Sequence, residues 1–270
     1  MIFDTWGDNI NRIYKCNNLL FGGKILQGYI RCLATVFGDF SGFEINSKRI
    51  YEIMGALAEF EVIPNVIDEF QIEIKNNIPS QKLAKRVQLV SSKNKLVVNF
   101  FQNNITVEAE PQTEEKNIDD FITDAKKILE ISLKLMGKKA NRISLVTTYL
   151  DESNLDNQYE RYAKPVPFFQ GKNVFEWNIK SAVREDCNIS GKNEEINVIS
   201  NIFRAKGRIG SSLPTPANNT FDGVLFEIDI NTIPENSSER IDADFINSFY
   251  DSAISKKSEI ERKISDDEEQ

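Results

Sequence analysis

Residues 25–37 read ILQGYIRCLATVF, and their apolar side chains recur at every second position. A period of two is that of a β-strand, because successive side chains of an extended chain point to opposite faces. The members of the apolar face are Leu26, Ile30, Cys32, Ala34 and Val36. The stretch therefore predicts a strand, and the turn residues GDFSG at 38–42 predict its end.

A helix is expected after this strand. Ser47 is a suitable N-cap, and the apolar residues that follow it are spaced as one helical stripe. That stripe consists of Ile50, Ile53, Met54, Leu57 and Phe60. Pro64 is expected to close the helix, since proline lacks a backbone donor and disfavours a helical residue before it.

Short strands are expected on both sides of a second helix. They are predicted at residues 70–75, 86–91, 96–101, 105–110 and 142–150, and the last of these reads RISLVTTYL. The residues SKNK at 92–95 are typical of a hairpin turn. The helix begins at Asn117 as N-cap and ends at Gly137, with apolar residues at helical spacing between them.

The chain changes character after residue 150. Residues 151–172 are polar and aromatic with little periodicity, and we expect them to connect two halves, 1–150 and 173–264. The second half is expected to contain three long strands, at 175–187, 196–208 and 224–230, and a helix at 242–264, before an acidic tail at 265–270. This order predicts an α+β fold with antiparallel sheets, helices packed on one face, and two intimately packed halves.

The composition excludes several kinds of chemistry. The 270 residues contain no histidine, which removes imidazole-based triads and histidine metal sites. Cys16, Cys32 and Cys187 are too widely spaced for a thiolate metal site or a disulfide framework. No basic leader followed by an apolar run opens the chain, and no window has the length of a membrane span, so a cytoplasmic protein without a membrane is expected.

The net charge of −8 bears on the partners that the protein can bind. It disfavours nucleic acid without excluding it, because a local basic patch would work against the field of the whole molecule. Arg204, Lys206 and Arg208 form such a patch at a spacing of two, and they are the candidate site for an acidic partner. The alternative is a solvated row that is balanced across the sheet by acidic neighbours such as Glu176, Glu227 and Asp229.

Two further sets of residues have a functional and an ordinary interpretation. Glu227 and Asp229, or Asp68, Glu73 and Lys75, could serve a metal-dependent hydrolase or nuclease, although the same spacing is typical of the polar face of a strand. Phe175, Trp177, Phe203 and Phe226 could line the cavity of a small-ligand carrier, or they could be ordinary core residues. Neither pattern is strong enough to assign catalytic residues, a metal site or a cofactor.

Four segments carry a resemblance to known proteins: RVQLVS at 86–91, LVVNF at 96–100, RISLVTTY at 142–149 and GVLFEIDI at 223–230. In strand character and spacing they resemble a sporadically distributed, uncharacterised family of prokaryotic proteins of about this size. The resemblance implies a horizontally exchanged gene of the phage-defence or toxin–antitoxin kind. No constellation of acid, base, nucleophile or metal ligands is visible, and the connections are rich in aromatic residues that can form an interface. The expected function is therefore a non-enzymatic interaction or regulatory subunit with a protein partner, with the hydrolase and the ligand carrier as alternatives.

Overall fold

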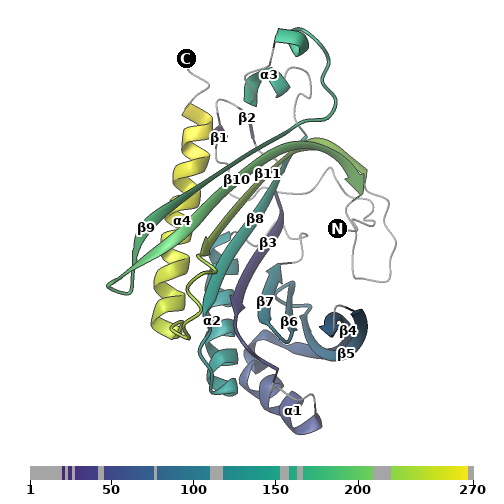
Figure 1. The fold of residues 1–270 in the computed structure, drawn as a ribbon, viewed down its shortest axis with the longest axis vertical. Helices are drawn as coiled ribbons and strands as arrows, with labels where there is room; N and C mark the ends of the chain where they lie inside the picture. Colours follow the sequence, from purple (N-terminus) through teal and green to yellow (C-terminus); the bar gives the residue numbers. More distant parts are fainter. Residues whose placement is uncertain are drawn as a thin grey trace.

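The computed structural model describes residues 20–21, 24–25, 28–41, 46–75, 78–109, 118–152, 158–162, 167–208 and 220–266. Nine strands form one antiparallel sheet in the order β4-β5-β6-β7-β3-β8-β11-β10-β9 (Figure 1). Their bounds are β3 Gly28–Phe37, β4 Val62–Lys75, β5 Ile78–Ser91, β6 Leu96–Phe100, β7 Asn104–Ala109, β8 Arg142–Asp151, β9 Asn178–Ile189, β10 Lys192–Arg208 and β11 Thr220–Thr232. A separate two-residue pair joins β1 Leu20–Phe21 and β2 Lys24–Ile25. The predicted α+β class is confirmed.

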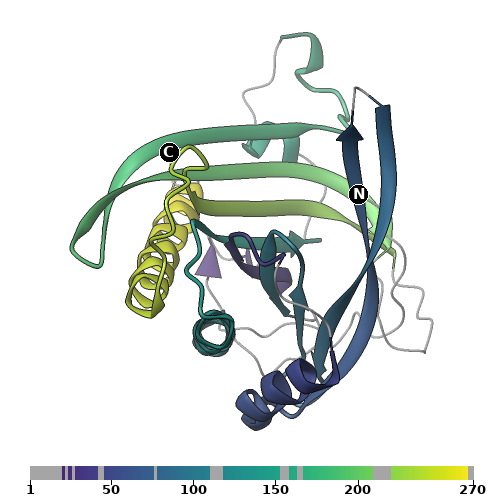
Figure 2. The same cartoon turned by 60° about the horizontal axis from the view of Figure 1, so that its bottom comes forward.

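Three long helices pack against one face of this sheet. They are α1 Ser47–Ala56, α2 Ile118–Met136 and α4 Ala243–Asp266, and the shorter helical segments are η2 Ala58–Phe60, α3 Gln158–Tyr162 and η3 Pro167–Phe169. Figure 2 shows α2 and α4 on the same side of the sheet, with the β4–β5 hairpin rising away from them. Apolar residues of α2 and α4, including Phe121, Leu129, Phe245 and Phe249, are fully buried in the main core against the sheet.

The strand predicted over residues 25–37 forms as β3, Gly28–Phe37, at the middle of the sheet, whereas Ile25 belongs to β2 and Leu26 lies outside the described residues. Ile30 departs from the predicted face and packs against Leu150 and Leu225, because the register shifts between Tyr29 and Arg31. Cys32, Ala34 and Val36 face the helices and belong to the main core, as their alternation predicts. The second helix also ends as predicted, because Gly137 follows α2 in the left-handed region at φ +61°, which glycine adopts without strain.

Three local expectations were wrong. Asn46, not Ser47, caps α1, since its side chain accepts a hydrogen bond from the backbone N–H of Arg49 at 3.0 Å. Pro64 does not close a helix but lies inside β4, an edge strand, where the missing N–H need not join a ladder. Phe175 and Trp177 precede β9 instead of belonging to it.

The sheet crosses the expected boundary between two halves without a break. β8, from the first part of the chain, pairs with β3 on one side and with β11, from the second part, on the other. A division into two packed halves is therefore not confirmed. Among the described helices, none combines the length and the apolar character that a membrane crossing requires.

Candidate functional site

One face of the nine-stranded sheet carries no described helix. The core residues of each strand alternate with residues that point away from α2 and α4; Ile143 and Leu145 on β8, for example, lie in the core, and Ser144 lies on the opposite face. We call this second face of the sheet the open face. None of the described long helices covers it, but Thr35, Ser144 and Asn231 in its middle are buried, so the exposure of its side chains is greatest toward the edges of the sheet.

A single polar row crosses the whole open face. Each strand contributes one residue, and the pairing register places these residues side by side from one edge to the other. In the order of the strands they are Asn65, Gln88, Asn99, Thr106, Thr35, Ser144, Asn231, Asn197 and Arg184. Eight of the nine side chains are uncharged amides or hydroxyls, so the row can donate and accept hydrogen bonds without attracting a particular charge.

Hydrogen bonds link the members of this polar row at both ends. On one side, Gln88 Nε2 donates to Asn99 Oδ1 at 2.8 Å, and Asn99 Nδ2 donates to Thr106 Oγ1 at 3.2 Å. On the other side, Asn197 Nδ2 donates to Asn231 Oδ1 at 3.2 Å. An amide has two donor hydrogens and two acceptor lone pairs, so each of these amides can form more hydrogen bonds than the ones named here. The ladder therefore fixes the orientation of the amides while it keeps part of their capacity for a partner.

A second row, of seven aliphatic side chains and the two carboxylates Glu108 and Asp229, runs beside the polar row on the same face, and we call it the aliphatic row. Its members, again one from each strand in register, are Ile63, Val90, Val97, Glu108, Leu33, Val146, Asp229, Ile199 and Ala182. Leu33, Val146 and Ile199 are half-buried, and Ile63 at the edge is 63% exposed. Half-buried aliphatic side chains next to oriented amides provide apolar contact area and hydrogen-bonding groups on one face.

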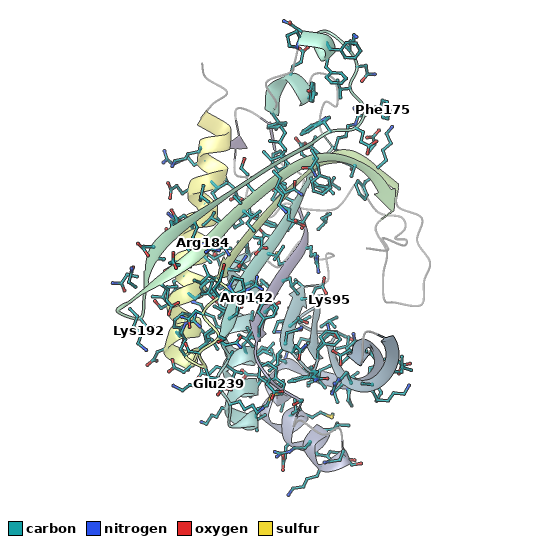
Figure 3. The ribbon with its side chains drawn as sticks, in the orientation of Figure 1. Lys95, Arg142, Phe175, Arg184, Lys192 and Glu239 are labelled. Carbon is teal, nitrogen blue, oxygen red and sulfur yellow. The ribbon has the colours of Figure 1, made fainter. Side chains whose placement is uncertain are left out.

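The arginines of the open face are already occupied by partners within the chain. Arg31 Nε lies 3.1 Å from Glu108 Oε1, and Arg86 Nε lies 2.5 Å from Glu69 Oε2. Arg142, in the middle of the sheet (Figure 3), donates from Nη2 to Asn231 Oδ1 at 3.1 Å. The carboxylates of Glu108 and Glu69 offset the charges of Arg31 and Arg86, which reduces the positive charge that a phosphate backbone would need, whereas Arg142 bonds a neutral amide.

Two buried polar atoms on the open face have no hydrogen-bond partner within the part of the chain that the structure describes. They are Arg142 Nε and Asn201 Oδ1, on β8 and β10 on either side of the polar row. Buried polar atoms without a partner are rare in folded proteins, since each costs about 1–3 kcal/mol. Both atoms are buried within the chain, so their missing hydrogen bonds do not by themselves indicate a partner.

The paired carboxylates Glu227 and Asp229 also lie on the open face. Asp229 Oδ1 accepts a hydrogen bond from Asn231 Nδ2 at 2.9 Å, and Glu227 lies across the ladder from Asn201 and Thr148. Within the described residues, three or more metal-binding side chains do not gather at any point, these two carboxylates included. Their arrangement is that of the polar side of a strand.

The predicted basic row is paired across the sheet. Lys206 Nζ lies 2.7 Å from Asp222 Oδ2, and Arg204 Nη2 lies 3.3 Å from Asp222 Oδ1, whereas the side chain of Arg208 is outside the described part. Partial burial acts to raise the pKa of Asp222, but the hydrogen bond from Lys206 and the charge of Arg204 outweigh it and lower that pKa. The balancing acid is thus Asp222, which is not among the acids that the sequence suggested.

Glu152 adjoins this charged group. Its Oε1 accepts a hydrogen bond from the backbone N–H of Asp222 at 3.3 Å. Burial raises the pKa of Glu152, and the backbone hydrogen bond opposes this effect only in part, while the charges of Asp222 and Asp151 add to it. The sequence offered no signal for this group, because Glu152 and Asp222 are 70 positions apart.

The other predicted sets are not brought together. Asp68 forms an ion pair with Lys85 on the neighbouring strand, and the side chains of Glu73 and Lys75 are outside the described part. The aromatic set is split: Trp177 and Phe226 lie in one buried cluster, Phe203 packs beside a different one, and Phe175 is 72% exposed near one end of the molecule (Figure 3). These four aromatic residues therefore do not line one cavity.

Comparisons with known proteins add no relative. No family model, no curated protein and no solved structure matches this chain. Functional interpretation therefore depends on the geometry of the chain itself.

Proposed function

We propose that this chain is a non-enzymatic binding subunit whose open face docks a protein partner. The observation that carries the proposal is the pairing of two aligned rows on a sheet face without a described helix, one row of amides and hydroxyls and one mainly aliphatic. A protein surface presents backbone amides and apolar side chains together, which is the mixture that these two rows complement.

The charges of the open face favour a protein over a nucleic acid. Arg31 and Arg86 are neutralised by Glu108 and Glu69, and the whole chain carries a net charge of −8. Nucleic-acid affinity depends on unneutralised basic side chains that displace counterions from phosphates. The setting in a mobile defence or toxin–antitoxin system stays a prediction from the resemblance alone.

A matched pair of variants tests the proposal. Val146→Lys places a charge in the middle of the aliphatic row, and Val66→Lys makes the same change at an exposed position on the other face of the β4–β5 hairpin. Tagged wild type and both variants are used as baits in cells of the source organism, and captured proteins are quantified by mass spectrometry. We expect a partner that wild type and Val66→Lys enrich equally and that Val146→Lys loses.

Binding of that partner is then measured with purified proteins by calorimetry. Thermal melts of both variants establish that they are folded. A partner that binds Val146→Lys as tightly as wild type would show that the open face is not the docking surface, and the proposal would be wrong.

A further inference from the structure

β9 is one of the two edges of the sheet. It pairs with β10 through twelve consecutive residues without a register shift, and no described strand pairs with its other side. Residues 180–184 are exposed on both faces, and the apolar Val183 among them is 57% exposed. A long, regular edge strand presents unpaired backbone donors and acceptors and is a template for another strand.

The two edges of the sheet differ in their protection. β4, the opposite edge, contains Pro64, and proline on an edge strand interrupts the pattern of donors that a new strand needs. β9 contains no proline, and its backbone shows no bulge against β10. A proline that interrupts strand pairing is therefore present in the edge strand β4, and the edge strand β9 contains none.

The charges of β9 are complementary to those of a second, antiparallel copy of β9. A twofold axis perpendicular to the sheet keeps each residue on its own face, so opposed residues differ by an even number of positions. With the axis at Val183, Lys180 of each copy lies opposite Asp186 of the other copy, so the dimer contains this contact twice. Val183 lies opposite Val183 of the second copy. Both charged side chains are exposed.

The neighbouring registers of the same symmetry bring like charges together. With the twofold axis at Ala182, Lys180 lies opposite Arg184 of the second copy. With the axis at Arg184, Arg184 lies opposite Arg184 of the second copy. Directly opposed like charges destabilise an antiparallel pair, whereas opposite charges stabilise it. The sequence of the strand thus favours one register of self-pairing.

We infer that two copies of this chain associate through their β9 strands, centred on Val183, to form a continuous eighteen-stranded sheet. Each copy contributes nine strands to this sheet. The twofold axis leaves both open faces on the same side, so the dimer presents them as one surface. Self-association does not depend on what the open face binds.

A charge exchange tests this register. Lys180→Glu and Asp186→Lys each replace two attractive pairs by two repulsive ones, and each is expected to raise the dimer dissociation constant about tenfold or more, as measured by sedimentation velocity. Mixing the two single variants restores opposite charges at both contacts and should restore the dimer. Residues 180 and 186 are six positions apart on one strand, so this rescue cannot arise within one chain. Lys48→Glu on α1, at a lysine side chain that is 86% exposed, is the control and should not change the dissociation constant.

A cross-link provides a second measurement. Val183→Cys brings two thiols together at the axis and should give a disulfide-linked dimer on mild oxidation, whereas Val66→Cys at the other edge should not. Circular dichroism melts establish that every variant is folded. Wild type that sediments only as a monomer would overturn the inference, and so would a dimer that both charge variants leave intact or a Val183→Cys chain that does not cross-link.

Discussion

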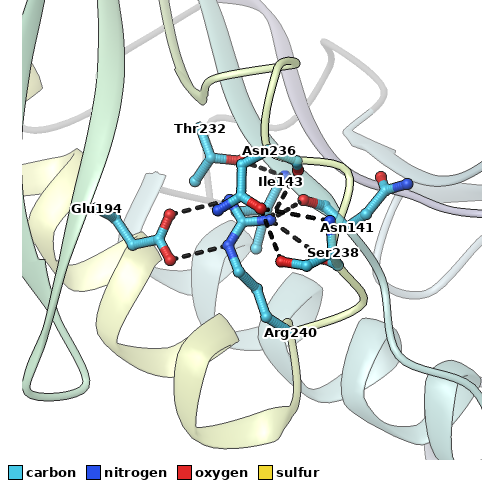
Figure 4. A network of polar contacts seen from close by, with 7 residues as sticks. All are labelled: Asn141, Ile143, Glu194, Thr232, Asn236, Ser238 and Arg240. Atoms are coloured by element: carbon cyan, nitrogen blue, oxygen red, sulfur yellow. Dashed lines mark hydrogen bonds and ion pairs between the residues drawn. The ribbon is translucent and has the colours of Figure 1, made fainter.

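Arg240 and Glu194 form a bidentate ion pair in which Nε lies 2.8 Å from Oε1 and Nη2 lies 2.9 Å from Oε2 (Figure 4). The side chains are 11% and 7% exposed. Arg240 Nη1 also donates to the backbone carbonyls of Asn141, Asn236 and Ser238. One guanidinium therefore joins β10, the start of β8 and the loop that leads into α4.

Removal of one partner of this pair is predicted to be costly. Glu194→Ala leaves a buried guanidinium without its carboxylate, and the free energy of unfolding should fall by about 3–5 kcal/mol, measured by urea denaturation. The double variant Glu194→Leu/Arg240→Met removes both charges and should recover part of that loss. Arg184→Ala at the exposed ion pair with Glu235 is the control and should have a much smaller effect. Equal losses of unfolding free energy in Glu194→Ala and Arg184→Ala would contradict the prediction.

The stability of α4 is predicted to depend on pH through Asp242. Its Oδ1 accepts a hydrogen bond from the backbone N–H of Phe245 at 3.2 Å, and its Oδ2 lies 3.0 Å from Lys139 Nζ. The hydrogen bond from Lys139 lowers the pKa of Asp242, with a further contribution from the N–H of Phe245. Because the folded pKa is lower than the unfolded one, this stabilisation is complete above the unfolded pKa and is lost as the pH falls through the folded pKa.

Asp242→Ala should lower the free energy of unfolding by about 0.5–2 kcal/mol at neutral pH, which is the usual cost of replacing an N-cap side chain by alanine. The difference between wild type and variant should shrink below about pH 4, where aspartate is protonated in the unfolded chain. Denaturation curves at several pH values measure both effects. Asp244→Asn, in the first turn of α4, is the control variant. If the loss of unfolding free energy in Asp242→Ala stays constant down to acid pH, Asp242 is not the residue whose ionisation stabilises α4.

Lys206 is predicted to act in stability and not in partner binding. It lies directly across the ladder from Asp222, so Lys206→Glu opposes two carboxylates and should lower the free energy of unfolding by about 0.2–1 kcal/mol. High salt should reduce this loss, since salt screens exposed charges. Weaker binding of a partner, with an unchanged melting temperature, would favour the binding row that the sequence suggested.

Asn99 is predicted to be the most sensitive member of the polar row. It is 9% exposed and is bonded on both sides, to Gln88 and Thr106, so Asn99→Ala should cost about 1–2 kcal/mol. Asn65→Ala, at the exposed end of the same row, should cost less than about 0.5 kcal/mol. Thermal melts of the two variants provide the measurement, and equal melting temperatures would mean that the ladder does not stabilise the sheet.

The sequence determined most of the elements and, in the regular part of β3, the face that each side chain takes. The alternation of Cys32, Ala34 and Val36 predicted a strand with one face in the core, and the helical spacing before Gly137 predicted α2. Such patterns are local, because the geometry of a strand or helix fixes the direction of neighbouring side chains. Pro64 was misinterpreted for the same reason: proline ends a helix and also occupies an edge strand, and nothing local shows which strand becomes an edge.

Only the tertiary structure decided which residues become neighbours across strands. Period two places Ser144 and Asn231 on one face of their strands, but the register of β8 against β11 makes them adjacent, and they are 87 positions apart. The register of β10 against β11 joined Lys206 to Asp222 in place of the acids expected from the sequence. Register depends on turn geometry and on how the whole sheet packs against α2 and α4, and both of these are set by contacts between distant parts of the chain.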